Sequence, residues 1–305
     1  MKKIVIAGAS GLIGSKLSLL LAKSGYKVLG LVRGAAKISQ KIKHDNIEFK
    51  EWSSENEPKL VAQYLEGAHA VINLAGSSVG GKRWNKEVKE ELYNSRIHST
   101  RQLVTASDLC NEKPEVYISA SGVGIYGYRG DEVLNEDSSK GNDFLAKLCI
   151  DWELEAHKAD KFARVVCIRT AVVFDKHAGG LQEIIKPFKF FVGGWFGDGR
   201  QWFPWIHIDD IINIYKFCIE NEKVVGALNA SAPDVVRNKE FSKEVAAALH
   251  RPCLFPVPGF ALRLAVGEFA DTLLNGQRTS SEKLQTLGYG FKYPELKPAL
   301  SNLLQ

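Results

Sequence analysis

Three glycines spaced three residues apart, Gly8, Gly11 and Gly14, constrain the fold more than any other feature of the sequence. They follow the apolar run Lys3–Ala7, which predicts a buried strand, and they precede the amphipathic stretch Leu12–Ser24, which predicts a helix. In this setting the first glycine permits a tight turn, the second lets the backbone approach a diphosphate, and the third lets the helix pack closely on the strand. The free N–H groups at the start of the helix then face the anion. The pattern therefore predicts a dinucleotide-binding unit.

The first 170 residues alternate between short apolar runs and longer amphipathic stretches. Strands are expected at Lys3–Ala7, Lys27–Val32, Ile47–Trp52, Ala70–Leu74, Val116–Ala120 and Val165–Thr170. Helices are expected near Leu12–Ser24, Pro58–Glu66, Asn85–Cys110 and Asp143–Asp160. This alternation favours a parallel sheet with helices on both faces, and the short hairpin turns of an antiparallel sheet are absent. The predicted fold class is α/β, with a Rossmann-type doubly wound parallel sheet.

The sequence changes in character after about residue 170. Glycine and aromatic residues crowd the segment Gly193–Trp205, and a helix is expected to begin at Asp209–Asp210. A short strand at Ala227–Ala230 and a helix at Lys239–Leu249 follow. We expect residues 1–170 to form the dinucleotide-binding domain, with segments between 200 and 230 returning to it. Residues 171–305 are expected to form a smaller, substrate-facing lobe that ends in a helical module.

Composition argues against several classes of protein. The 40 basic and 35 acidic side chains are interspersed, so no tail or stripe for nucleic acid is indicated. The five cysteines are widely spaced without a Cys-x-x-Cys pair, which is typical of free thiols in a reducing compartment. No apolar run approaches the roughly 18 residues that span a bilayer, and the run at the N-terminus is too short for a signal peptide. We expect a cytoplasmic protein with no membrane or nucleic-acid partner.

Arg33 directly follows the second expected strand. Dinucleotide sites usually place an acidic residue there, against the 2′-hydroxyl of the adenosine ribose. A guanidinium instead favours a 2′-phosphate through a charge-assisted contact. The alternative is a solvated surface arginine. The expected cofactor is NADP(H).

Further motifs resemble those of the extended short-chain dehydrogenases/reductases. Residues 72–76 (INLAG) resemble the element at their fourth strand, and residues 119–127 (SASGVGIYG) resemble the serine-rich segment at their fifth. The chain is most similar to an atypical subgroup of NAD-dependent epimerase/dehydratase-like proteins, known only as epimerase family proteins. The marks of that subgroup are the pair Arg83-Trp84, the segments Phe144–Glu153 and Gly193–Asp210, and a C-terminal module of unknown function. The resemblance covers essentially the whole chain.

This resemblance implies the cofactor contacts residue by residue. The matching positions are Gly8, Ser10, Gly11, Leu12, Ile13 and Gly14 for the phosphate turn, Arg33 for the 2′-phosphate, and Leu74, Ala75 and Gly76 for the wall beside the adenosine and its ribose. Arg96 stands where many members have an asparagine that faces the cofactor. With Glu91 about one turn earlier, it resembles a clamp specific to the subgroup. The alternative is an ordinary solvated pair on a helix surface.

The catalytic pair of the superfamily is missing. Related enzymes use a tyrosine as proton donor and, four residues later, a lysine that binds the nicotinamide ribose and lowers the tyrosine pKa. Only Tyr293 and Lys297 have this spacing, and they lie near the C-terminus, away from the helix that follows the fifth strand. The spacing of this pair is therefore coincidental.

On the expected helix two registers are open. One register places Asp143 and Lys147 at the two catalytic positions, and an aspartate is ionised at neutral pH and donates protons poorly. The other register is set by Glu153 and places Leu145 and Cys149 there. Neither register provides the usual pair.

Other groups could take over the chemistry. Tyr126 or Tyr128, on the loop after the fifth strand, and His207 are candidate proton donors. Ser121, or alternatively Ser119, is a candidate to hold a substrate carbonyl or hydroxyl. The tyrosines are equally well explained as packing residues. His207 is better explained as a structural residue beside an apolar strand, with Asp209 capping the next helix. No metal site is expected, because no cluster of His or Cys accompanies His207.

Two functions fit these observations. The first is an NADP(H)-dependent oxidoreductase or epimerase that acts on a small polar substrate, such as a sugar nucleotide; the serine-rich segment and the loop Gly193–Arg200 favour it. The second is an NADP(H)-binding sensor or regulatory protein with little turnover, which the missing tyrosine–lysine pair favours. The two long helices at Asn85–Cys110 and Asp143–Asp160 could also form the homodimer that is common in the superfamily.

Overall fold

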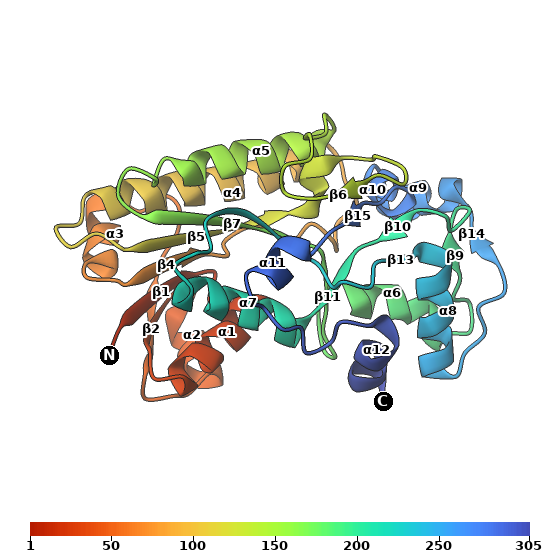
Figure 1. Ribbon diagram of the computed structural model, residues 1–305, viewed down its shortest axis with the longest axis horizontal. Helices are drawn as coiled ribbons and strands as arrows, with labels where there is room; N and C mark the ends of the chain where they lie inside the picture. The colour runs from red at the N-terminus through yellow and green to blue at the C-terminus, as the bar shows by residue number, and fades with distance from the viewer.

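A seven-stranded parallel sheet lies at the centre of the computed structural model, which describes residues 1–305 (Figure 1). Its strands, in order across the sheet, are β12 (Gly226–Ala230), β7 (Arg164–Thr170), β5 (Val116–Gly122), β4 (Ala70–Asn73), β1 (Lys3–Ala7), β2 (Lys27–Val32) and β3 (Ile47–Glu51). The strand order reverses at β1, which pairs with β2 on one side and with β4 on the other. Ligands of such sheets bind at this switch point, beyond the carboxyl ends of the strands. The predicted fold class is confirmed.

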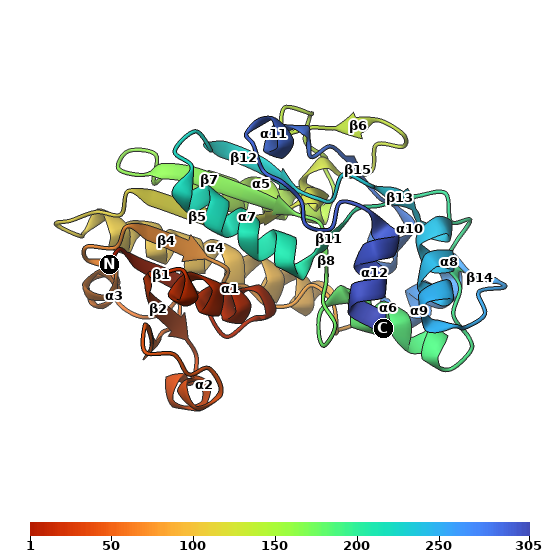
Figure 2. The same cartoon turned by 60° about the horizontal axis from the view of Figure 1, so that its bottom comes forward.

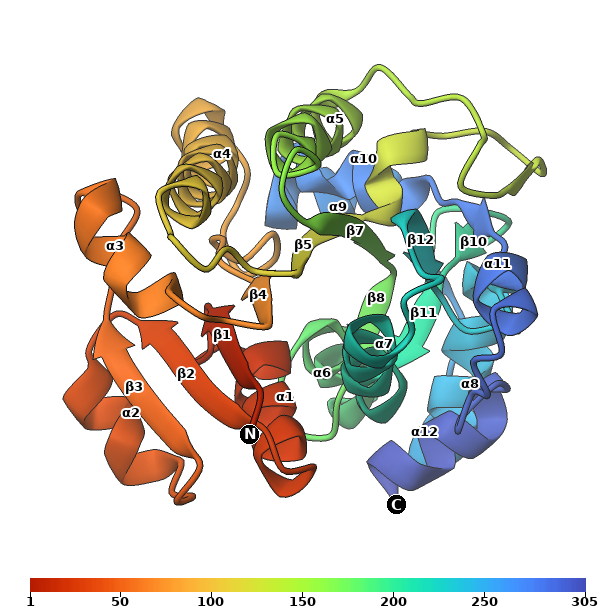
Figure 3. The ribbon, with the colours of Figure 1, turned by 60° about the vertical axis from the view of Figure 1, so that its left-hand side comes forward.

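Helices cover both faces of the sheet (Figure 3). One layer consists of α3 (Pro58–Leu65), α4 (Lys86–Asp108) and α5 (Phe144–His157). The other contains α1 (Leu12–Lys23), α2 (Ala35–Lys41), α7 (Ile208–Glu220) and α11 (Glu282–Thr286). The sequence did not predict α2, a seven-residue helix without a buried residue. No helix of the chain is both long enough and apolar enough to cross a bilayer.

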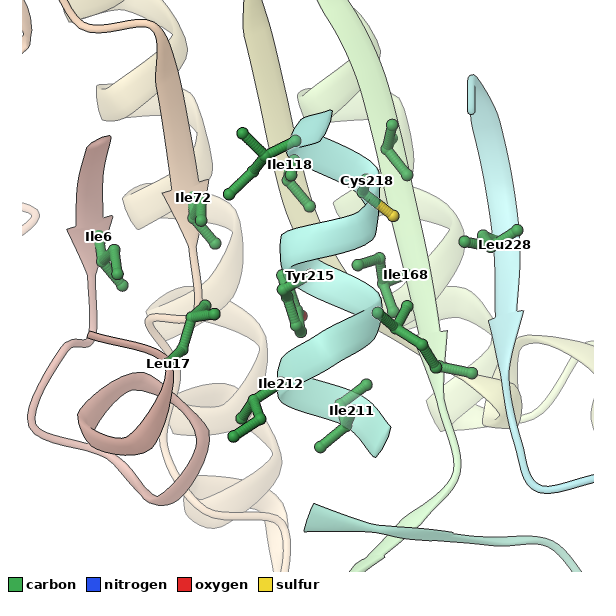
Figure 4. Packing of buried hydrophobic residues seen from close by; sticks show 14 of the residues in the cluster. Ile6, Leu17, Ile72, Ile118, Ile168, Ile211, Ile212, Tyr215, Cys218 and Leu228 are labelled. Atoms are coloured by element: carbon green, nitrogen blue, oxygen red, sulfur yellow. The ribbon is translucent and has the colours of Figure 1, made fainter. Parts of the chain in front are cut away.

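Successive side chains of each strand serve the two layers in turn. In β1, Ile4 and Ile6 belong to the core beneath α1 and α7, whereas Val5 and Ala7 belong to the core beneath α3 and α4. Figure 4 shows Tyr215 of α7 among strand residues of the first core. Because both faces are covered, the strands are apolar throughout, and this is why they appear in the sequence as continuous apolar runs.

A second core lies at one end of the sheet (Figure 2). The rings of Trp205 and Phe241 stack on Phe174, with centroids 5.4 and 5.5 Å away, and Leu300 covers the cluster. Helices of this lobe are α6 (Gly180–Lys189), α8 (Asn238–Leu249), α9 (Gly259–Val266), α10 (Phe269–Leu274) and α12 (Leu296–Leu304). Short strands complete the chain: β6 (Val133–Leu134), β8 (Val172–Phe174), β9 (Trp195–Phe196), β10 (Trp202–Phe203), β11 (Trp205–His207), β13 (Val236–Arg237), β14 (Pro256–Val257) and β15 (Arg278–Thr279).

The chain passes several times between the sheet and this lobe. It leaves the sheet through β8, returns through β11 and α7, and completes the sheet edge with β12. It returns once more after α10, where β15 pairs with β6 and the Tyr289 hydroxyl donates to the Asp210 carbonyl oxygen of α7 at 3.0 Å. It then runs from Tyr289 to α12 in the second core, so five segments of the chain join the two cores.

Candidate functional site

The three glycines turn the chain from β1 into α1. Gly8 has a φ of 79°, and a Cβ on it would lie 2.8 Å from the Leu74 carbonyl oxygen. A Cβ on Gly14 would lie 2.4 Å from the Gly8 carbonyl oxygen. Gly11 precedes α1 without a capping side chain, and the first turn of α1 holds no acidic residue. The first N–H groups of α1 therefore have no capping side chain, and they could donate to an anion such as a diphosphate.

One cation pairs with a carboxylate after the end of β2, and the charge of a second cation acts on the same carboxylate. Glu91 accepts a hydrogen bond from Lys82 Nζ at 2.7 Å. This bond, together with Ser77 and the charge of Arg33, lowers the pKa of Glu91. Arg33 is exposed and makes no ion pair at contact distance. Lys82 was not predicted as a site residue from the sequence. It could have been found from its position directly before the Arg83-Trp84 pair, which is one of the motifs of the subgroup.

Glu51 binds the backbone amides that follow Arg33. Its carboxylate oxygens accept the N–H groups of Gly34 at 2.7 Å and Ala35 at 2.9 Å, and these bonds lower the pKa of Glu51. The start of α2 is thus already occupied by an anion. The side chains of Arg33 and Lys82 remain as the cationic groups that a phosphate could bind at this edge.

Trp84 fixes the loop that carries Lys82. Its indole Nε1 donates to the Val79 carbonyl oxygen at 2.9 Å. The ring packs on Phe144 and Phe269, with centroids 5.5 and 5.2 Å away, and is buried. This explains why a tryptophan follows the basic residues of the loop.

Glu91 and Arg96 do not form the expected clamp. Five residues along a helix turn the side chains about 140° apart, beyond the contacts that neighbours three or four residues apart can make. Arg96 instead points inward and is 9% exposed, so the solvated alternative is also wrong for it. A Cβ on Gly76 would lie 3.2 Å from Arg96 Cζ. Arg96 therefore borders the wall formed by the residues after β4.

The structure selects the second register of α5. Lys147 is exposed, and Asp143 is the N-cap of the helix. Leu145 and Cys149 face the end of β5, where a Cβ on Gly122 would lie 3.5 Å from Cys149 Sγ. Burial raises the pKa of the Cys149 thiol to about 11. The two positions thus hold an apolar side chain and a neutral thiol.

Ser121 is tied to a buried ion pair. Its hydroxyl donates to Glu153 Oε1 at 2.7 Å, and Arg169 binds both oxygens of Glu153 at 2.9 Å. Ser121 is 5% exposed. Because its proton is committed to Glu153, Ser121 can hold a ligand only as a hydrogen-bond acceptor.

The structure places the predicted proton donor Tyr126 in the core, away from solvent. Its side chain is fully buried, and its hydroxyl donates to Asn229 Oδ1 at 2.6 Å while it accepts from Arg169 Nη1 at 2.9 Å. Burial raises the pKa of Tyr126 to about 12. The hydroxyl is a fixed part of the core, which was the alternative interpretation. Tyr128, in contrast, is 60% exposed.

The structure places the second predicted proton donor, His207, at the start of α7, where both of its ring nitrogens have partners. His207 Nδ1 accepts the Asp209 N–H at 3.0 Å, so His207 itself, and not Asp209, caps α7. Its Nε2 lies 3.2 Å from Asn302 Oδ1 of α12, and its ring lies 3.8 Å from that of Tyr293. Burial lowers the pKa of His207. Both ring nitrogens thus serve the fold.

Most of the chain matches the models of two known families. Residues 4–230 match the NAD dependent epimerase/dehydratase family, and residues 257–303 match a domain of unknown function, DUF1731. The first match covers the sheet and the glycine turn, and the second covers α9 to α12.

Individual relatives cover nearly the whole chain. Epimerase family protein SDR39U1 homolog, chloroplastic, of Arabidopsis thaliana is 37% identical over 307 residues, which are 99% of this chain and 86% of that protein. Epimerase family protein YfhF of Bacillus subtilis is 36% identical over 303 residues, 99% of this chain and 97% of that protein. The crystal structure of human epimerase family protein SDR39U1 (isoform 2) with NADPH superposes with a TM-score of 0.88 at 29% identity, covering 99% of both chains.

Proposed function

The chain belongs to the NAD dependent epimerase/dehydratase family, and from this we propose that it binds NADP(H) and acts as an oxidoreductase or epimerase-like protein on a small polar substrate. The observation that carries the proposal is the uncapped start of α1 behind glycines whose Cβ atoms would fill the turn, with Arg33 and Lys82 beside it. Human SDR39U1 was crystallised with NADPH, which is consistent with this choice.

Each part of the cofactor has proposed partners. They are Gly8, Ser10, Gly11, Leu12, Ile13 and Gly14 for the diphosphate, Arg33 with Lys82 for the 2′-phosphate, and Leu74, Ala75 and Gly76 for the adenosine ribose. Glu91 positions Lys82 and itself contacts no phosphate, because a carboxylate repels one.

The nicotinamide, when bound, supplies hydride transfer, and the chain orients the substrate. Ser121 would accept a hydrogen bond from a substrate hydroxyl, since Glu153 already takes its proton. We assign cofactor binding to residues 1–170 together with the segments between 200 and 230 that return to the sheet, and substrate binding to the rest of residues 171–305.

Isothermal titration of the protein with NADPH and NADH tests the cofactor. We expect NADPH to bind at least about tenfold more tightly, the gain of one charge-assisted hydrogen bond. Arg33→Ala should remove most of this difference, whereas Lys41→Ala, which removes an exposed cation in the last turn of α2, should leave it unchanged. Equal affinities in the unmutated protein would refute the assignment.

A second candidate is an NADP(H)-binding sensor with little turnover. The observation in its favour is that Leu145 and Cys149 stand where a proton donor and its lysine are needed. Oxidation of NADPH with a panel of carbonyl compounds separates the two candidates. An enzyme consumes the cofactor with at least one compound and loses this activity in Ser121→Ala; a sensor consumes none.

A further inference from the structure

Arg96 is a buried cation without an anionic partner. Its Nη1 donates to the Leu92 carbonyl oxygen of its own helix at 3.1 Å, and its guanidinium lies 5.1 Å from the centre of the Trp152 ring. No carboxylate lies within ion-pair distance of it or affects its pKa, which desolvation lowers. A guanidinium carries five N–H donors, and its charge is costly to bury without compensation.

The acidic groups nearby do not supply the missing charge. Cys149 is the one acidic neighbour whose charge would act on Arg96, but its pKa of about 11 leaves the thiol neutral at physiological pH. Glu153 is bound at both oxygens by Arg169, so its charge is already compensated. Glu91 is paired with Lys82 on the exposed side of α4.

The position of Arg96 places this charge beside the proposed reaction centre. Helices α4 and α5 lie next to each other over β4 and β5 (Figure 3), and Arg96 faces the seam between them. On one side it touches the loop at Gly76; on the other it neighbours Cys149, which in turn adjoins Ser121. In the same seam Trp152 Nε1 is buried without a hydrogen-bond partner. The cation thus lies near the ends of β4 and β5, where the Ser121 hydroxyl also lies, and the ring that carries the second donor packs on the cation.

We propose that Arg96 binds the substrate and that the substrate carries an oxyanion, either a carboxylate or a phosphate. A planar guanidinium donates two parallel hydrogen bonds to such a group, and the anion supplies the charge that the chain lacks. Uncharged substrates would leave the cation buried and unpaired. The identity of the anion as substrate rests on the proposed function, whereas binding of an anion at Arg96 does not.

Isothermal titration with oxalate and with inorganic phosphate, in a buffer free of other polyvalent anions, tests the proposal on the full chain with and without saturating NADPH. Four proteins are compared: the unmutated chain, Arg96→Gln, Arg96→Lys and the control Arg101→Gln. Arg101 lies on the same helix and pairs with Glu155, with its side chain 55% exposed. We expect at least one probe to bind the unmutated protein and Arg101→Gln equally, to bind Arg96→Gln at least about tenfold more weakly, and to bind Arg96→Lys with intermediate affinity. The preferred probe distinguishes a carboxylate from a phosphate.

The outcomes separate this proposal from the cofactor assignment. If NADPH does not bind but an anion still requires Arg96, the cofactor assignment fails and the anion site stands. If Arg96→Gln weakens NADPH as much as it weakens the probe, Arg96 binds a cofactor phosphate and the proposal is overturned. Absence of probe binding, or equal binding to all four proteins, also overturns it.

Thermal unfolding without ligand provides a second readout. Arg96→Met keeps the packing on Trp152 and removes the uncompensated charge, so we expect a higher melting temperature than that of the unmutated protein. A lower melting temperature would show that Arg96 serves the fold, contrary to the proposal.

Discussion

Burial controls the ionisation of the cysteine side chains. It raises the pKa of Cys110 and Cys149 to about 11 and that of Cys218 to about 12, and all three are buried. Cys167 is also buried, and only Cys253 is partly exposed. The thiolate is the reactive form. Four of the five thiols are therefore protected from reagents in two ways, because reagents cannot reach them and because they stay protonated.

We therefore expect DTNB at about pH 8 to label only Cys253 in the native protein. In denaturant all five thiols should react, since all are free. The variant Cys253→Ser serves as the control and should show no rapid labelling. Rapid reaction of a second thiol in that variant would contradict the burial of the other four.

The closest backbone approach in the site is at Gly14. Gly14→Ala would place a Cβ 2.4 Å from the Gly8 carbonyl oxygen, so the turn must shift. We expect a loss of about 1–3 kcal/mol in unfolding free energy and a much weaker affinity for NADPH, measured by urea unfolding and by titration. Gly290→Ala meets no neighbouring atom and has no positive φ, so it should change neither quantity. A Gly14→Ala protein that binds NADPH normally would refute the role of the turn.

At the scale of single elements, His207 joins the start of α7 to α12. Its folded pKa is lowered, so between the unfolded value near 6.5 and the folded value the unfolded chain binds a proton that the native chain does not. Stability contributed by the neutral ring is present above about pH 6.5 and is lost as pH falls through the folded pKa.

The variant His207→Asn should weaken this dependence, because asparagine still caps a helix but does not titrate. Between about pH 7 and 5 we expect its unfolding free energy to fall by up to about 1.4 kcal/mol less per pH unit than that of the unmutated protein. The matched control is His98→Asn on the exposed side of α4, which should keep the unmutated slope. Equal slopes in all three proteins would argue against the role of His207.

The long elements could be predicted from the sequence, and the short ones could not. Both sheet faces are covered, so every central strand is an apolar run in the sequence. The helix α4 spans several turns, so its pattern of apolar and polar residues repeats often enough to be recognised. The helix α2 has no buried residue and hence no apolar periodicity to detect.

The site was predictable where backbone geometry carries the function. The glycine turn follows from the need for close approach, which only glycine permits. The orientation of Tyr126, Arg96 and Lys82 was not predictable, because it depends on partners distant in sequence, such as Asn229 and Trp152. The register of α5 also needed the structure, since Glu153 is recognised by its bonds to Ser121 and Arg169.

At the scale of the whole molecule, α12 seals the second core. Leu300 is 1% exposed among the side chains of that core. Leu300→Ala should cost about 2–5 kcal/mol of unfolding free energy, whereas Leu254→Ala, at a side chain 67% exposed, should change it by less than about 0.5 kcal/mol. Urea unfolding followed by circular dichroism measures both.

The repeated passage of the chain between the cores predicts one cooperative transition for Leu300→Ala as well. Damage to the second core is transmitted through α7, which packs on α1, and through Tyr289, which bonds to α7. Two separate transitions, with the sheet surviving the loss of the lobe, would contradict this coupling.

The return of the segment after α10 to β6 and α7 has a mechanical consequence. A lobe attached by one linker can move as a rigid body, and a single proteolytic cut in that linker separates it from the rest of the protein. Here a cut in the Pro252–Pro258 loop would leave the two fragments bound to each other. The C-terminal fragment would still pair with β6 through β15 and with α7 through Tyr289, both of which belong to the N-terminal fragment. Ligand entry therefore requires movement of individual loops and not of the whole lobe. The cleaved chain should elute from gel filtration as a single species until denaturant is added.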